Sequence, residues 1–161
     1  MQNEQKNEDA VWAELSEEQQ QTVEKLQNTM TEDALWECVI QFQQYLFQTA
    51  SGLPFHYEIK RGKSGKLNRE LLIDRREGSK SLTWSSFRSA FFNLMQEPPE
   101  DGKRKYVNRP KGLGDIRGVS YIYPMFYRFG IIEVPEKYEI QMKGRQTLEK
   151  FELYTKHIKT L

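Results

Sequence analysis

Basic residues interleaved with aromatic and hydroxyl side chains are the part of this sequence whose chemistry suggests a function. They recur in three glycine-containing stretches between residues 60 and 117. Lysine and arginine pair with phosphate oxygens, and glycine lets backbone N–H groups approach them closely. The pattern predicts contact with a nucleic acid, DNA above all. The candidate phosphate-binding residues are Lys60, Arg61, Lys63, Lys66, Arg75, Arg76, Lys80, Lys103, Arg104, Lys105, Arg109, Lys111 and Arg117.

The charge of the chain is divided between its two parts, although the net charge is only +1. Residues 1–50 hold two basic residues against ten acidic ones, and residues 51–161 hold 22 basic against 13 acidic ones. Such a division suits a protein-interaction module, an inhibitor or a regulator that acts through acidic helices and a basic face, or a homodimer. A further alternative is that these residues have no binding function and are ordinary solvated surface charges.

Residue patterns that could support catalysis are weaker than the pattern of basic residues. Glu58, Lys60 and Asp74 could hold a divalent metal for phosphodiester cleavage, but the aspartate follows the Glu-x-Lys strand instead of preceding it. Residues 111–115 lack the spacing of a phosphate-binding P-loop. The single cysteine, Cys38, excludes an internal disulfide, and two separated histidines leave too few ligands for structural zinc. We therefore expect no enzymatic activity, cofactor or metal.

The elements that must position the basic residues indicate an α+β fold, a mainly helical single domain with a β-hairpin and one or two further short strands. Phe55, Tyr57 and Ile59 alternate with polar residues, as in a half-buried strand. Residues 61–66 form a polar turn with two glycines, and residues 67–73 return as the second strand. The hairpin tip is therefore predicted to be basic.

The acidic N-terminal part is predicted to be helical. Residues 1–10 lack apolar periodicity and are expected to be disordered, which leaves an acidic helical segment over residues 11–52 and a basic α+β segment over residues 53–161. Ser16 and Gln19 have the spacing of a capping box that begins a first helix. Thr31 is the predicted N-cap of a second helix, whose apolar stripe continues to Leu46 and which ends at Gly52.

Further elements follow the hairpin. A helix from Trp84 is stopped by the two prolines at 98 and 99, and residues 100–114 have loop composition. We predict a helix over residues 121–129 with Pro124 in its first turn, strands over 131–134 and 138–142, and a C-terminal helix through residues 148–158. The 24 residues between the helices are too many for a helix-turn-helix motif.

Localisation follows from what the sequence lacks. No run approaches the roughly 18 apolar residues of a membrane span, and the polar N-terminus is unlike a signal peptide. We expect a cytoplasmic protein without a membrane partner.

Overall fold

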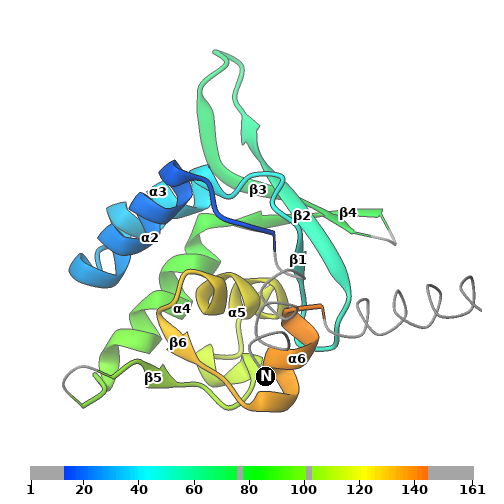
Figure 1. Cartoon of the computed structure of the whole chain (residues 1–161). Coiled ribbons are helices and arrows are strands. Elements are labelled where there is room, and N and C mark those ends of the chain that lie inside the picture. The colour runs from blue at the N-terminus through cyan, green and yellow to red at the C-terminus, as the bar shows by residue number, and fades with distance from the viewer. Residues whose placement is uncertain (1–12, 76–77, 101–102, 145–161) are drawn as a thin grey trace, which may run out of the picture.

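The computed structural model describes residues 13–75, 78–100 and 103–144 (Figure 1). They form two N-terminal helices, a four-stranded antiparallel sheet and a helical C-terminal part that contribute to one hydrophobic core. The α+β class predicted from the sequence is confirmed. The predictions for residues 1–10, for Arg76 and for a helix over residues 148–158 lie outside the described residues.

The first described helix, α2 (Glu17–Thr29), begins at the predicted capping box. The Gln19 N–H donates to Ser16 Oγ at 3.1 Å, and the Ser16 N–H donates to Gln19 Oε1 at 2.9 Å. Thr31 caps the next helix, α3 (Glu32–Gln41), by accepting a hydrogen bond from the Ala34 N–H. Both predicted helix starts are therefore confirmed, because each side chain satisfies a backbone donor that the helix leaves unpaired.

Helix α3 ends at Gln41, so the prediction that it reaches Gly52 is wrong. Gln44 adopts a left-handed conformation (φ 66°), and its N–H donates to the Tyr57 carbonyl at 2.8 Å. The chain then forms β1 (Phe47–Gln48), which pairs with the next strand as the edge of the sheet. Leu46, predicted to lie on the apolar stripe, is 54% exposed. Apolar residues continue at helical spacing through this turn, so periodicity alone did not reveal it.

The sheet has the strand order β1-β2-β3-β4, and all its neighbours are antiparallel. Strands β2 (Pro54–Arg61) and β3 (Leu67–Arg75) form the predicted hairpin, and Phe55, Tyr57 and Ile59 face the core as expected. Strand β4 (Gly78–Thr83) was not predicted. Leu82 is its only buried residue, so its sequence has no visible alternation.

Helix α4 (Trp84–Gln96) begins after Thr83 and ends before the two prolines, as predicted. It buries Trp84, Phe87 and Leu94 in the core. Its outer side carries Met95 and Phe92, which are 42% and 64% exposed. The helix thus covers the core with one face and presents apolar side chains to solvent with another.

The predicted loop over residues 100–114 contains two short elements. Strand β5 (Lys105–Tyr106) pairs in parallel with β6 (Ile132–Glu133), which confirms the strand expected near residues 131–134. The 3₁₀ turn η1 (Pro110–Leu113) follows β5 and is tied to α4 by the Asn93 side-chain amide, which donates to the Leu113 carbonyl at 2.9 Å.

Helix α5 (Val119–Arg128) starts earlier than predicted, so that Pro124 lies beyond its first turn. Every residue from Tyr121 to Phe126 is buried, and this packing offsets the backbone hydrogen bond that proline cannot donate. The last described helix is α6 (Glu136–Met142), where we predicted a strand. Pro135 precedes it, and acidic Glu136 stands in its first turn, both of which favour a helix start.

None of the helices within the described ranges is long and apolar enough to cross a bilayer.

Candidate functional site

The tip of the β2–β3 hairpin carries three of the predicted phosphate-binding residues. The turn is closed by the Gly62 N–H, which donates to the Lys66 carbonyl at 2.8 Å. Arg61, Lys63 and Lys66 are exposed, and none of them forms an ion pair with a described acidic residue. Figure 1 shows this tip projecting beyond α3 and the rest of the fold.

Arg69 supports the hairpin where it meets the helices. Its guanidinium lies 5.1 Å from the ring centre of Trp36 on α3 and 5.6 Å from that of Trp84 on α4. The two indoles contact each other edge to face, with centroids 5.0 Å apart. This cation–π contact joins β3 to both helices, so the tip projects from a supported base.

Three other candidates are engaged within the fold. Lys60 Nζ lies 3.1 Å from Glu70 Oε1 and 2.7 Å from Ser81 Oγ on the outer face of the sheet. Arg75 donates to the Tyr121 hydroxyl at 2.9 Å, and Lys80 Nζ lies 5.7 Å from the centre of the same ring. These contacts join β2, β3, β4 and α5. Each of the three cations therefore has a partner within the fold.

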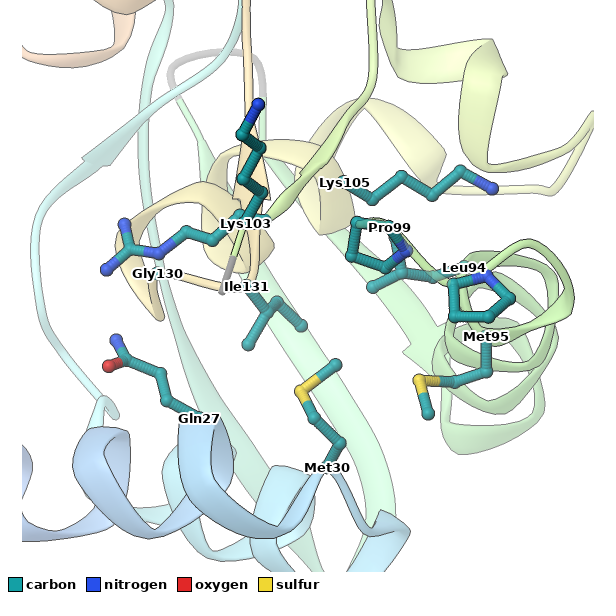
Figure 2. A pocket seen from close by; sticks show the side chains of 11 residues that line it. Gln27, Met30, Leu94, Met95, Pro99, Lys103, Lys105, Gly130 and Ile131 are labelled. Atoms are coloured by element: carbon teal, nitrogen blue, oxygen red, sulfur yellow. The ribbon is translucent and has the colours of Figure 1, made fainter. Parts of the chain in front are cut away.

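Lys103, Arg104 and Lys105 border a groove of about 370 Å³ between the ends of α2 and α4, the β5 segment and the turn after α5. Figure 2 shows the lysines on one side of this groove and Met30 and Met95 on the other. The remaining lining is mainly apolar. The groove residues are Gln27, Met30, Leu94, Met95, Pro98, Pro99, Lys103, Arg104, Lys105, Gly130 and Ile131.

The groove lysines have only loose ionic partners. Lys103 Nζ lies 3.4 Å from Glu100, and Lys105 Nζ lies 4.0 Å from Glu97. The side chains of both glutamates are more than four-fifths exposed, so solvent screens these pairs strongly. Arg104 forms no ion pair with a described residue. Positive charge is therefore available at this edge.

The predicted basic residues do not gather on one surface. The hairpin tip and β5, which belongs to the groove, stand at opposite ends of the view in Figure 1. Arg109, Lys111 and Arg117 are exposed in and around η1. The basic residues thus divide into a projecting tip, a groove edge and a set near η1. Lys60, Arg75 and Lys80, which have partners within the fold, stand apart from these three sets.

The residues weighed for hydrolysis have other contacts. Asp74 lies 3.2 Å from His56 Nε2, while Glu58 stands on the outer face of the sheet opposite Leu72. Across the ranges that the structure describes, no three His, Cys, Asp or Glu side chains are placed to hold a metal ion.

Cys38 is fully buried between α2 and α3, and its thiol donates to the Thr22 carbonyl at 3.1 Å. Burial raises its pKa to about 12, so the sulfur is protonated at neutral pH. The thiol therefore packs as a small apolar group.

The apolar half of the groove was missed by reasoning from the sequence. In the sequence, Pro98 and Pro99 indicate only the end of a helix, and Met95 is only a residue of its last turn. Met30 and Ile131 lie far from them in sequence, so no local pattern links the four segments. A methionine followed closely by two prolines at a helix end was the one available signal.

Comparisons with family models, with curated proteins and with solved structures returned no match. The function proposed for this chain therefore depends on the chemistry of its own surface.

Proposed function

We propose that the protein is a noncatalytic nucleic-acid-binding accessory protein that contacts phosphates through the tip of its β2–β3 hairpin. The observation that carries the proposal is the projection of this tip, which presents Arg61, Lys63 and Lys66 without an acidic partner among the described residues. Cations on a projecting element can reach a polyanion before the acidic N-terminal helices approach it.

The shape of the hairpin supports a duplex as the ligand. The major groove of B-DNA admits a two-stranded β-ribbon, and the phosphates that border it are spaced closely enough for several cations on one turn. Lysine and arginine side chains that contact phosphates carry no sequence information by themselves. We therefore expect binding that is largely independent of sequence.

Salt dependence gives the proposal a quantitative form. Each phosphate neutralised on B-DNA contributes about −0.9 to the slope of log K against log salt concentration. Three contacts from the tip predict a slope of about −2.7. A slope of this size belongs to weak, readily reversible binding, which suits an accessory role.

The test is binding of a fluorescent 20-base-pair DNA duplex, followed by anisotropy from 25 to 200 mM salt. Lys63→Ala with Lys66→Ala should weaken binding and reduce the magnitude of the slope by about 1.8. The matched control is Lys25→Ala with Lys137→Ala, which removes two exposed cations that are not among the candidate phosphate-binding residues and should leave the slope unchanged. Absence of binding at 25 mM salt, or equal losses in the two variants, would overturn the proposal.

A further inference from the structure

The groove bordered by Lys103, Arg104 and Lys105 combines an apolar lining with an edge of positive charge. We propose that it binds a segment of a partner protein that carries aliphatic side chains together with at least two carboxylates. This interaction surface is separate from the hairpin tip and does not depend on nucleic-acid binding.

The floor and walls of the groove explain the aliphatic part of this ligand. Leu94 and Ile131 are each 4% exposed and form the floor, while Met30, just after α2, and Met95 on α4 face each other (Figure 2). Methionine side chains adapt their shape to different apolar partners, as in binding surfaces that accept several peptides.

The basic edge of the groove explains why the proposed ligand carries carboxylates. Among the described residues, Lys103 and Lys105 form ion pairs only with glutamates that are themselves highly exposed, and Arg104 has no acidic partner there. A carboxylate delivered by a docking segment would meet these cations beside an apolar wall, where water is partly displaced and charged hydrogen bonds are stronger. Charge complementarity thus selects an acidic segment over a basic one.

One end of the groove is held open by the turn after α5. The Gln27 side-chain amide donates to the Phe129 carbonyl at 3.1 Å and fixes α2 to this turn. At Gly130 a side chain would collide with the Gln27 amide and meet the Arg104 guanidinium at 3.5 Å. The absence of a side chain there preserves the space between the cation and the apolar floor.

A nucleic acid fits this groove less well than a peptide. Single-stranded nucleic acids bind largely by stacking bases on aromatic side chains. None of the residues that line the groove is aromatic. Its methionine, leucine, isoleucine and proline surfaces suit aliphatic side chains instead.

The test begins with selection of a random 12-residue peptide library displayed on phage against the full chain. We expect the enriched peptides to combine Asp or Glu with Leu, Ile, Met or Phe. One of them, synthesised with a fluorophore, should bind Met95→Glu at least tenfold more weakly than the unaltered chain. Leu46→Glu is the matched control, because Leu46 is similarly exposed but lies outside the groove.

Charge reversal tests the edge. Lys103→Glu with Arg104→Glu should weaken the selected peptide at least tenfold, and a peptide with lysines in place of its acidic residues should bind this variant better than it binds the unaltered chain. Circular dichroism of each variant checks that the fold is intact. Lys63→Ala with Lys66→Ala should bind the peptide normally, which separates this proposal from the one for nucleic acids.

Three outcomes would overturn the proposal: enriched peptides without acidic residues, affinity that is insensitive to Met95→Glu, or failure of the charge-reversed peptide to recover binding. Displacement of the peptide by a 20-nucleotide single-stranded DNA, with DNA affinity lost in the Lys103→Glu and Arg104→Glu variant, would assign the groove to a nucleic acid instead.

Discussion

Gly130 shows how a single residue sets the shape of the groove. Its φ of 73° lies in the left-handed region, where a side chain is strained, and the Gln27 amide occupies the space that a Cβ would need. Gly65 in the hairpin turn has a similar φ of 79°, but nothing lies within 4 Å of its missing Cβ. A comparison of substitutions at the two glycines therefore distinguishes the free-energy cost of backbone strain from that of a steric collision.

We expect Gly65→Ala to lower the free energy of unfolding by about 1 kcal/mol, which is the cost of the left-handed backbone. Gly130→Ala should lower it by about 2 kcal/mol or more, because the Gln27 amide must also move and its hydrogen bond to Phe129 is lost. Urea unfolding followed by tryptophan fluorescence measures both. Equal losses would show that Gln27 moves aside without penalty.

At the scale of elements, the two N-caps at Ser16 and Thr83 differ in one respect. Ser16 accepts a hydrogen bond from the Gln19 N–H, whereas Thr83 makes no side-chain cap to α4. The start of α4 is fixed instead by the strand that leads into it and by the burial of Trp84 and Phe87. Local capping and tertiary packing thus define different helix starts in one chain.

Ser16→Ala should lower the free energy of unfolding by about 1 kcal/mol, because the Gln19 N–H loses its acceptor. Thr83→Ala, which removes no cap bond, is the control and should cost clearly less. Thermal unfolding by circular dichroism compares the two. A larger loss for Thr83→Ala would mean that its hydroxyl contact with Ser85 stabilises the start of α4.

The sequence predicted those elements whose signals are local. The capping box at Ser16, the alternation of Phe55, Tyr57 and Ile59, and the prolines after α4 each depend on a few neighbouring residues. The errors arose where tertiary contacts decide. Helix α3 ends before Gln44, because the Gln44 N–H donates to the carbonyl of Tyr57 on β2. Pro124 is tolerated inside α5 because its neighbours are buried.

The candidate site also has one part that local signals predict and one part that only tertiary contacts reveal. The basic hairpin tip was predictable, since charge, glycine and strand alternation are all local features. The groove was not, because it is assembled from four segments and its apolar side chains resemble core residues in the sequence. The internal contacts of Lys60, Arg75 and Lys80 were also not predictable, because their partners lie on other strands or on α5.

At the scale of the whole molecule, Glu139 links the stability of the fold to pH. Its carboxylate accepts hydrogen bonds from Lys143, at 2.9 Å, and from the Tyr127 hydroxyl, which ties α6 to α5. Burial alone would raise the pKa of Glu139, but these hydrogen bonds and the charge of Lys143 outweigh it and lower the pKa below its usual range. The ionised form is therefore favoured by folding.

A carboxylate with a lowered pKa stabilises the fold above its unfolded pKa of about 4.3, and this contribution is lost as the pH falls through the folded value. Glu139→Gln should lower the free energy of unfolding at pH 7 by less than about 1 kcal/mol, since the side chain is 37% exposed. The difference between the two proteins should shrink as the pH falls below the unfolded pKa. Urea unfolding at pH 7, 5 and 3 tests this. The control is Glu58→Gln, at an exposed carboxylate that forms no ion pair with a described residue. A difference at Glu139 that stays constant with pH would contradict the assignment.

The strand order of the sheet has a consequence for how the molecule folds. Strands β1 to β4 pair with their neighbours in the sequence, so each pairing closes only a short loop. The parallel pair of β5 and β6 must instead bring Lys105 to Ile132 across η1 and α5, and a longer loop loses more conformational entropy on closure. We therefore expect the sheet to form first, and the groove, whose edge and floor meet at this late pair, to be the last part completed and the first to open.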